Sequence, residues 1–500
     1  MTNVVETIKY QIEGIIKNSV QRASENGEIP ELPVEELTIE VPKDAGHGDF
    51  STNIAMQAAK VAKKPPRQVA DIIIKNMDLN NTYIDRVETA GPGFINFFLN
   101  NDWLYDALKF IQTKGEDYGR IDLGKGQRVM VEFVSANPTG PLHMGNARGG
   151  ALGDCIASVL ERAGYDVTRE YYVNDAGNQI EKFGISLEAR YIQLLKGEDA
   201  IEFPEDGYQG EDIIERVKEY IEENGDKLLN VDSEERRKEL VKYVLPKNVE
   251  AIRNGLESYG IKFDVWFSEQ SLYDSGEVQE TLDYLEKNGY TTKKDGAVWF
   301  KATELGADKD EVLVRNNGIP TYFASDIAYH RNKFLKRGFD RVINLLGADH
   351  HGHAGRMKCA VKALGIDPDK LDVVLFQLVR LYRNGEIARM SKRTGKAISL
   401  TDLLEEVGRD AARFFFNTKA SGNHLDFDLD LAVEESKDNP VFYVQYAHAR
   451  ICSMLSLLES EGFKVPDINS VQLSLLEAPE EIELMKKLAA YPEEIRISAQ

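Results

Sequence analysis

Cysteine is scarce in this 500-residue sequence, and apolar runs are short. The three cysteines, Cys155, Cys359 and Cys452, lie far apart and form no Cys-x-x-Cys pair. Their spacing excludes a disulfide framework or a thiolate zinc site built within the chain and is typical of a reducing compartment. Runs such as Val373 to Leu378 fall short of the roughly 20 residues that cross a bilayer, and residues 1–17 lack the apolar block of a secretory signal. The sequence therefore predicts a cytoplasmic protein with no membrane partner.

Basic residues are also fewer than acidic ones. The chain has 61 basic and 83 acidic residues and a net charge of −22. This argues against a protein coated with lysine for non-specific binding of nucleic acid, because phosphate binding needs positive charge. It does not exclude a large enzyme that gathers cations on one face. Lys60, Lys63, Lys64 and Arg67 have the spacing of one side of a helical turn before Pro65 and Pro66 interrupt it, although a solvated helix end explains that cluster better when it is taken alone.

The length predicts several domains, because single cores stop growing at roughly 250–300 residues. Residues 1–118 mix helical and strand patterns, and residues 119–430 carry an α/β pattern. A charged helical insertion interrupts that pattern at about 185–260, and residues 431–500 are purely helical in pattern. In the α/β part, hydrophobic periodicity predicts helices at 151–163 and 354–364. It predicts strands at 129–134, 167–173, 341–346 and 373–379.

A loop between the first of these strands and its helix combines turn formers with a histidine. It reads Pro138-Thr139-Gly140-Pro-Leu-His143-Met-Gly145-Asn146-Ala-Arg148. A helix N-terminus offers unpaired N–H groups and a positive dipole end to an anion. Gly145 has no Cβ to keep a nucleotide from the backbone, and His143 could donate to phosphate oxygens. A histidine beside a glycine turn is commonplace, however, so this motif alone predicts little.

A basic segment, Arg389-Met390-Ser391-Lys392-Arg393-Thr-Gly395-Lys396, is expected after the last strand. It is not a P-loop, because Met390 stands where that motif requires its first glycine. Alone, it is best explained as a solvated loop. Paired with the histidine loop at the other end of one α/β pattern, it predicts two loops that close over the same triphosphate, because open parallel sheets bind ligands beyond the carboxyl ends of their strands.

These two loops resemble the signatures of class I aminoacyl-tRNA synthetases. His143-Met-Gly145-Asn146 is similar to their His-x-Gly-His motif, with Asn146 in place of the second histidine. Met390-Ser391-Lys392 is similar to the core of their Lys-Met-Ser-Lys-Ser loop, with Arg389 and Arg393 at its outer positions. Within that class, the chain resembles the arginyl-tRNA synthetases of bacterial type in four segments, namely 46–49, 132–143, 172–179 and 439–450. Several independent motifs in one order identify the chain as a member of that family.

The resemblance implies a Rossmann-like parallel-sheet catalytic domain with a helical insertion, an N-terminal α+β domain that contacts tRNA, and a C-terminal all-α anticodon-binding domain. Because that helical domain usually continues further in the family, we expect residues 431–500 to be a truncated or abbreviated version. Catalytic stabilisation of phosphate charge is assigned to His143, Asn146 and Lys392. ATP binding is assigned to these three together with Pro138, Thr139, Gly140, Gly145, Gly347, Asp349, Met390 and Ser391.

Arginine recognition needs carboxylates and hydroxyls, because a guanidinium carries a fixed charge and five donors. The resemblance assigns this role to Glu269, Tyr322 and Asp326, of which the last two are four residues apart, on one face of a helical turn. It assigns the substrate's main-chain end to Asn137, and His350 is a further candidate for arginine. The tRNA candidates are Tyr443, Gln445, Tyr446 and Arg450, although aromatics at helical spacing are more often core residues.

The implied reaction is the two-step loading of L-arginine onto tRNA(Arg). Arginine attacks the α-phosphate of Mg·ATP, and the arginyl group of the adenylate then passes to the terminal adenosine of the tRNA. The resemblance further implies that the first step needs bound tRNA. We expect a monomer with no tightly bound metal.

Two other functions compete with this one. Asp349-His350-His351-Gly-His353 has the look of a metal cluster, and Asp-His-His runs occur in manganese phosphoesterases, but the further aspartates such a site needs are missing at suitable strand ends. In the synthetase interpretation the segment points toward adenosine and the substrate ammonium, and the sequence leaves open which histidine makes that contact. A nucleotidylyltransferase would be shorter, and a non-catalytic RNA-binding relative would have lost both signature loops.

Overall fold

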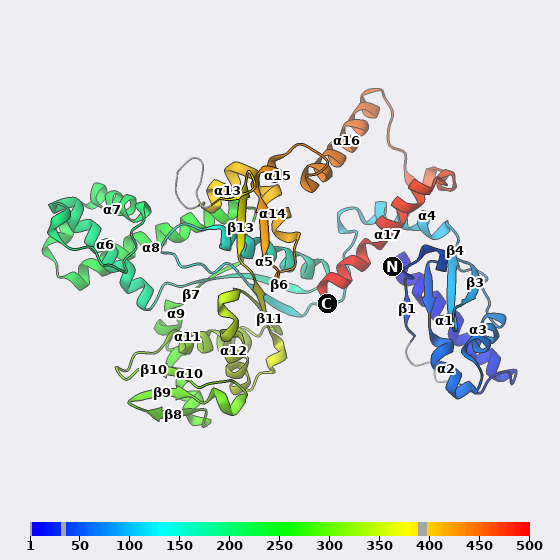
Figure 1. Cartoon of the computed structure of the whole chain (residues 1–500), viewed down its shortest axis with the longest axis horizontal. Coiled ribbons are helices and arrows are strands. Elements are labelled where there is room, and N and C mark those ends of the chain that lie inside the picture. Colours follow the sequence, from blue (N-terminus) through cyan, green and yellow to red (C-terminus); the bar gives the residue numbers. More distant parts are fainter. Residues whose placement is uncertain (1–2, 32–36, 389–397) are drawn as a thin grey trace. The chain divides into compact units, whose positions relative to one another are not determined.

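The computed structural model describes residues 3–31, 37–388 and 398–500 and divides the chain into two compact units (Figure 1). One unit combines residues 1–121 with 458–500, and the other comprises residues 122–457. Among the described residues, no helix is long and apolar enough to cross a membrane.

The first unit is built on a four-stranded antiparallel sheet in the order β1-β2-β4-β3. Its strands are β1 (Ile39–Glu40), β2 (Phe50–Thr52), β3 (Ile84–Ala90) and β4 (Phe94–Leu99). Its helices are α1 (Val4–Glu25), α2 (Ile54–Ala62), α3 (Pro66–Lys75), α4 (Asp102–Lys114) and α17 (Pro479–Ala499). The apolar faces of these helices share one core with the sheet, to which α17 contributes Met485 and Ala489.

The expected basic face in this unit does not form as the spacing predicted. Helix α2 ends at Ala62, Lys63 takes the left-handed conformation with φ 52°, and Pro66 starts α3. Proline fits the first turn of a helix, where its missing N–H is not needed. Lys60 therefore lies on α2 and Arg67 on α3, with a turn between them.

The second unit contains the predicted parallel sheet, with five strands in the order β12-β11-β5-β6-β7. These are β5 (Arg128–Glu132), β6 (Asp166–Val173), β7 (Val265–Ser268), β11 (Arg341–Gly347) and β12 (Leu371–Phe376). From β5 the chain builds outward to β6 and β7, and it later returns on the other side of β5 with β11 and β12. The strand order therefore reverses between β5 and β11, and ligands of such sheets bind in the crevice at this point.

Helix α5 (Met144–Arg162) links β5 to β6 and packs close to the sheet because glycines face it. A Cβ added at Gly153 would lie 2.3 Å from the ring of Phe133, and one at Gly149 would lie 2.9 Å from that of Phe376. Any larger side chain at either position would push the helix away. Two helices pack with β11 and β12, namely α11 (Tyr322–Arg331) and α12 (His351–Ala363).

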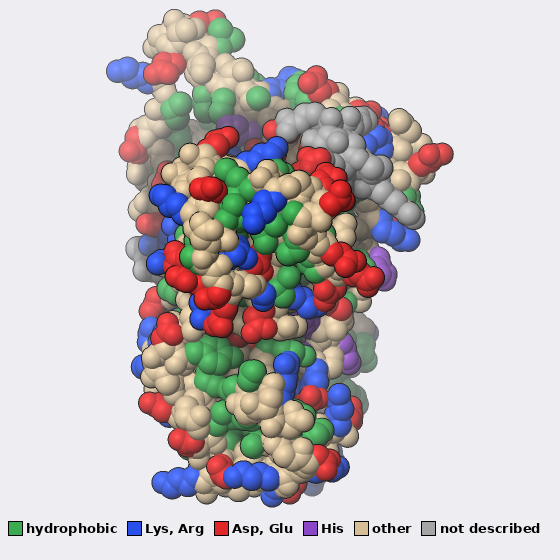
Figure 2. Space-filling model, turned by 90° about the vertical axis from the view of Figure 1, so that its left-hand side faces the viewer, with side chains coloured by type: hydrophobic (Ala, Val, Ile, Leu, Met, Phe, Trp, Pro, Cys, Tyr) green, Lys and Arg blue, Asp and Glu red, His purple; other side chains and the backbone are tan. Residues whose placement is uncertain are grey.

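The charged insertion is a helical module with its own apolar core. It consists of α6 (Asn178–Lys196), α7 (Glu211–Asn224) and α8 (Ser233–Ser258). Phe183, Tyr191, Val217 and Leu240 are buried between these helices. On the face of the molecule drawn in Figure 2, acidic and basic side chains are interspersed rather than gathered in one patch of either sign.

Two small sheets complete the second unit. The first, ordered β10-β9-β8, comprises β8 (Thr291–Lys294), β9 (Ala297–Phe300) and β10 (Glu311–Val314), near α9 (Gln270–Asp274) and α10 (Glu277–Lys287). The second, ordered β14-β13-β15, comprises β13 (Val379–Arg383), β14 (Glu386–Ile387) and β15 (Leu425–Asp428). The remaining helices are α13 (Leu400–Val407), α14 (Arg409–Asn417), α15 (Leu429–Val433) and α16 (Pro440–Ser460).

The second small sheet corrects one expectation. The strand predicted over 373–379 ends at Phe376, and Val379 begins a new strand in a different sheet. The apolar pattern of 373–379 continues through residues 377 and 378, where the chain leaves one sheet for the other, so the pattern does not reveal the change. The basic segment 389–396 therefore follows β14 and not the last strand of the parallel sheet.

Candidate active site

The backbone bends sharply directly after β5. Val134 and Ser135 adopt φ values of 67° and 39°, a region that non-glycine residues and β-branched residues above all avoid. Hydrogen bonds hold the bend in place: Tyr172 N donates to Ser135 Oγ at 3.1 Å, and Asn174 Nδ2 donates to Ser135 O at 3.1 Å. Strain that neighbours over-determine is typical of functional sites. Here it turns the chain from the sheet into the segment Asn137–His143.

The carboxyl ends of three adjacent strands are tied together at this edge. Asp175, which follows β6, accepts from Ser268 Oγ at 2.6 Å and from Gln270 N at 2.9 Å, both at the end of β7. Asn174 reaches the other way, to the bend after β5. Two residues of the motif 172–179 thus hold the ends of these three strands together.

His143 caps the N-terminus of α5. Its Nδ1 accepts the N–H of Gly145 at 3.2 Å, and its own N–H donates to Asn146 Oδ1 at 3.0 Å. Partial burial lowers the pKa of His143, so the ring is neutral at neutral pH. Because Nδ1 accepts, the proton of the neutral ring resides on Nε2. Asn146 correspondingly uses its oxygen in the cap and keeps its NH₂ group for other partners.

Gly145 makes room for this cap. A Cβ at Gly145 would lie 3.3 Å from Cε1 of His143, tighter than ordinary van der Waals contact. The absent side chain therefore serves the histidine ring itself. Pro138 and Thr139, earlier in the loop, are buried.

The loop of His143 is joined by backbone contacts to Ser399 and Leu400, which follow the basic segment. His143 and Ser399 form an antiparallel β-bridge, and Leu400 N donates to Leu142 O at 2.9 Å. Ser399 then caps α13, accepting from Asp402 N at 3.1 Å. Met390, Ser391 and Lys392 lie outside the described residues, as do Arg389 and Arg393. The chain that carries them nevertheless returns beside His143.

The end of β11 is the other side of the crevice. Gly347 ends that strand, and Asp349 and His350 follow in a single 3₁₀ turn before α12. The side chains of Asp349 and His350 are 81% and 55% exposed and 3.5 Å apart, so both are open to a ligand.

His353, rather than His350, contacts a predicted arginine-binding carboxylate. Its Nε2 lies 3.3 Å from Asp326 Oδ2. Burial and the nearby charges of Arg356 and His350 lower the pKa of His353 to about 4. The ring is therefore neutral at neutral pH, and the contact is not an ion pair.

Two of the predicted carboxylates, Glu269 and Asp326, resist ionisation; the first is buried and the second half-buried. Glu269 is 6% exposed and accepts from Ser325 Oγ at 2.8 Å, where Ser325 is the neighbour of Asp326 on α11. Burial raises the pKa of Glu269. Burial and the charges of Glu269 and Glu132 raise the pKa of Asp326 well above its ordinary value. A cation bound beside these two carboxyls, such as a guanidinium, would favour their ionised forms.

Tyr322 begins α11 and is 73% exposed, and Asn137 is also exposed. Tyr172 is buried near Glu269, and a hydrogen bond from its hydroxyl opposes the rise in the pKa of that carboxyl.

A buried lysine connects this pocket to the bend after β5. Lys333 is 0% exposed and donates to Glu132 and, at 3.2 Å, to Asn344 Oδ1. Asn344 Nδ2 donates to His330 Nε2 at 2.9 Å, and His330 Nδ1 then donates to the backbone oxygen of Asp326 at 2.8 Å. Lys333 belongs to a π-helical turn, Asn332–Lys336, an element frequent at functional sites.

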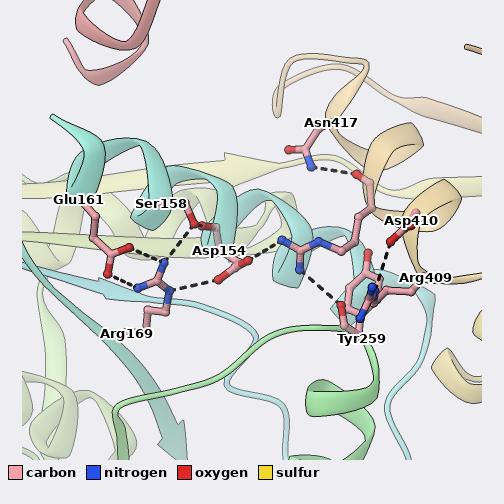
Figure 3. Close-up of polar contacts among 9 residues, drawn as sticks. Asp154, Ser158, Glu161, Arg169, Tyr259, Arg409, Asp410 and Asn417 are labelled. Atoms are coloured by element: carbon pink, nitrogen blue, oxygen red, sulfur yellow. Dashed lines mark hydrogen bonds and ion pairs between the residues drawn. The ribbon is translucent and has the colours of Figure 1, made fainter. Parts of the chain in front are cut away.

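Ion pairs hold α5 to the elements that follow the basic segment. Asp154 of α5 lies between Arg169 of β6, at 3.1 Å, and Arg413 of α14 (Figure 3). Arg148, 0% exposed, donates to the carbonyls of Gln377, Asn423 and Ala420 at 2.6–3.1 Å. Helix α5, which His143 caps, is thereby fixed to the chain segments before and after residues 389–397.

The histidine-rich segment forms no metal cluster in the described ranges, where no group of three or more His, Cys, Asp and Glu side chains is placed to hold an ion. The tRNA candidates lie on α16, where all four side chains are exposed. Tyr443 and Tyr446 are 62% and 52% exposed, and Arg450 donates to the Tyr446 hydroxyl at 3.1 Å.

Known proteins match every part of this chain. The family model for the class I (R) tRNA synthetase catalytic domain matches residues 108–436. An arginine–tRNA ligase of Acetivibrio thermocellus is 80% identical over 100% of this chain and 89% of its own length. One of Ruminiclostridium cellulolyticum is 69% identical over the same shares. The chain belongs to the arginine–tRNA ligase family. Members of this family charge tRNA(Arg) with arginine using ATP, by way of an adenylate.

The other matches confirm the domain types and the fold. Models of the arginyl-tRNA synthetase N-terminal domain and of the DALR anticodon binding domain match residues 10–99 and 444–500. The crystal structure of the Thermus thermophilus arginyl-tRNA synthetase superposes with a TM-score of 0.66 over 96% of this chain and 86% of that one, at 21% identity, which shows the fold alone. Membership in this family confirms the predicted enzyme class and excludes the phosphoesterase and nucleotidylyltransferase alternatives.

Sequence reasoning overlooked three residues that the structure places around the pocket: Lys333, Ser325 and Tyr172. Each has an ordinary local signature. Lys333 stands among other basic residues in Arg-Asn-Lys-Phe-Leu-Lys-Arg, which is typical of a solvated helix end. The available signal was weak: Lys333 is four residues after Tyr329, which is the spacing of one helical face.

Proposed function

We propose that the crevice between β5 and β11 binds ATP. Pro138, Thr139, Gly140, Gly145, Gly347 and Asp349 would surround the nucleotide. His143, Asn146 and Lys392 would stabilise charge on the phosphates, with Met390 and Ser391 beside them. The observation that supports this assignment is the backbone bridge between His143 and Ser399, which places the residues that follow the basic segment beside the cap of α5. Neutral His143 with its proton on Nε2 is a suitable donor to an anionic oxygen.

We further propose that Glu269 and Asp326 bind the guanidinium of arginine, with Tyr322 over the opening and Asn137 at the main-chain end. His350 is retained as a candidate, and His353 joins it because of its contact with Asp326. The high pKa values of both carboxyls support this role, since the pocket lacks the cation that the substrate brings.

In the first step, a carboxylate oxygen of arginine would attack the α-phosphorus of Mg·ATP, and pyrophosphate would leave. In the second, a hydroxyl of the terminal adenosine would attack the carbonyl carbon of the adenylate, and AMP would leave. The protein contributes position and charge stabilisation, so His143 and Asn146 act by donating hydrogen bonds rather than by covalent chemistry.

The finer assignments are proposals of the same kind. Mg²⁺ arrives with ATP, residues 1–118 and 431–500 contact tRNA, residues 119–430 catalyse, and the enzyme is a cytoplasmic monomer. Tyr443, Gln445, Tyr446 and Arg450 would stack on and hydrogen-bond to unpaired anticodon bases, for which exposed aromatics are suited.

Sedimentation velocity at several protein concentrations tests whether the enzyme is a monomer. Pyrophosphate exchange with and without tRNA tests whether adenylation requires tRNA.

The arginine pocket is tested by Asp326→Asn, which keeps the size of the side chain and removes its charge. Hydrogen bonds to charged groups contribute about 1.5–3 kcal/mol, so the KM for arginine should rise by about 10- to 150-fold in steady-state charging of tRNA. The KM for ATP should change by less than about twofold, because the nucleotide crevice is formed by other elements. Glu280→Gln is the matched control, since Glu280 contacts Arg331 of the same helix from outside, at 3.3 Å. Wild-type kinetics for Asp326→Asn would exclude the pocket.

A further inference from the structure

A buried side chain of the helical module 178–258 donates a hydrogen bond to the proposed nucleotide loop. Asn248 of α8 is 8% exposed, and its Nδ2 donates to the carbonyl oxygen of Pro138 at 3.0 Å. Its Oδ1 accepts from Nε of Arg216, on α7, at 3.1 Å. Arg216 is held in turn by both carboxylate oxygens of Glu219 at 3.0 Å. The amide of Asn248 therefore joins two helices of the module to one point of the loop.

Two close approaches extend this contact along the loop. A Cβ at Gly140 would lie 3.7 Å from Oδ2 of Asp212, which is on α7. A Cβ at Gly255, on α8, would lie 4.0 Å from Cδ1 of Leu142. The module thus lines the loop from Pro138 to Leu142, and Asn248 makes the hydrogen bond between them.

The loop has few means of holding its own conformation. Pro138 and Pro141 have no N–H to donate, so two of the loop's backbone donors are missing. The carbonyl of Pro138 is buried and needs a partner, which the loop does not supply but Asn248 does. Pro246 lies two residues before Asn248 in helix α8. Because proline has no N–H, the carbonyl of Lys242 lacks its usual helical donor.

We propose that Asn248 is a positioning residue for adenylate formation: it holds the carbonyl of Pro138 and so places the loop from Pro138 to His143 against the nucleotide. The charged module is then a support for the ATP loop and not only a peripheral insertion. This inference rests on the proposed function, because it takes that loop as the nucleotide site.

The variant Asn248→Asp separates the two bonds of this amide. It is isosteric, and its carboxylate still accepts from Arg216, so the module keeps its internal contact. Against Pro138 it places an oxygen beside an oxygen, which replaces attraction by repulsion. Because misplacement by about 1 Å can lower a rate by about 10²-fold, kcat/KM for ATP in tRNA charging should fall by about 10- to 100-fold.

Asn248→Ala removes both bonds without repulsion and lets water reach the carbonyl, so its loss of kcat/KM for ATP should be only several-fold. The order wild type, alanine, aspartate supports the proposal. An alanine variant as impaired as the aspartate variant, or an aspartate variant with wild-type kinetics, overturns it. This order holds even where both variants lower the melting temperature.

Ser233→Ala is the control for stability of the module alone. It removes the hydrogen bonds that join Ser233 to Glu188, at 2.9 Å, and to Arg237, and it touches nothing in the loop. Melting temperatures of all variants are measured beside the kinetics. If Ser233→Ala lowers kcat/KM for ATP as much as Asn248→Asp at the same loss of melting temperature, the effect belongs to folding and the proposal fails.

His143→Ala in the same assay distinguishes this inference from the proposed function. A large loss of kcat in His143→Ala with wild-type kinetics in Asn248→Asp rejects the positioning role and keeps the nucleotide site. Wild-type kinetics in both variants rejects the nucleotide site itself.

Discussion

The proposed nucleotide loop and the proposed arginine pocket would recognise opposite charges with different parts of the protein. The loop from Pro138 to Asn146 presents backbone N–H groups, the end of a helix and a neutral histidine, all within one stretch of sequence. The pocket presents the carboxylates of Glu269 and Asp326, from segments that are distant in the chain. An anion can be bound by backbone N–H groups alone, whereas a buried guanidinium is best matched by acidic side chains.

This difference sets what each site requires from its surroundings. The loop must be held in shape, which capping hydrogen bonds and the contact of Asn248 achieve. The pocket must be kept charged while buried, which requires a compensating cation. Lys333 meets this need only for Glu132: it lies fully buried against that carboxylate, and the pKa of Asp326 stays well above its ordinary value despite the charge of Lys333.

The largest expected effect is on the buried charges of the pocket. Lys333→Met keeps the length of the side chain but leaves Glu132 buried without its cation. Breaking such a pair costs about 3–5 kcal/mol of stability, which urea unfolding measures. Lys293→Met is the control, because both members of its ion pair with Glu286 are exposed, at 74% and 60%. Exposed pairs contribute less than about 1 kcal/mol.

The double variant Glu132→Gln with Lys333→Met sharpens this result. Removing both charges should recover most of the lost stability, because no buried charge then remains unpaired. Equal stability of Lys333→Met and the wild type would show that Glu132 finds another partner and that the pocket does not depend on Lys333.

The second effect is on catalysis at the nucleotide loop. His143→Ala removes the Nε2–H donor, and loss of one such donor typically lowers kcat by about 10²–10³-fold, or about 2.7–4 kcal/mol. His143→Asn keeps a side-chain oxygen that can cap α5, so it should restore stability but not kcat. Rapid charging of tRNA by His143→Ala would show that the loop binds without stabilising the transition state.

The third and smallest effect is on pH dependence. The raised pKa values of Glu269 and Asp326 mean that the native protein binds more protons than the unfolded chain just above the ordinary carboxyl range. Its stability therefore falls as pH rises through that window. Bound arginine favours the ionised carboxylates and removes this loss. The rise in melting temperature caused by saturating arginine should grow between about pH 5 and about pH 8.

The control for this measurement is the double variant Glu269→Gln with Asp326→Asn. Its carboxyls cannot titrate, so the remaining rise in melting temperature should be independent of pH. A rise that shrinks with increasing pH in the wild type would mean that the guanidinium binds elsewhere.

Local pattern predicted the parallel sheet, α5 and the helical insertion because each has a clear periodicity over many residues. It misjudged the strand expected over 373–379, because the chain changes sheet after Phe376 without a change of composition. It also placed Lys63 on a helical turn, whereas α2 ends at Ala62. Boundaries depend on single turns, which neighbouring elements decide.

The sequence by itself determined the class of enzyme and the location of its loops, because phosphate recognition by backbone and helix end lies within short contiguous motifs. Only the tertiary structure decided that Glu269 and Asp326 share a pocket, that His353 contacts it, that Lys333 is buried and that Asn248 holds the loop. These contacts join residues from separate elements, and burial changes the charge state of a side chain without leaving a trace in its local sequence.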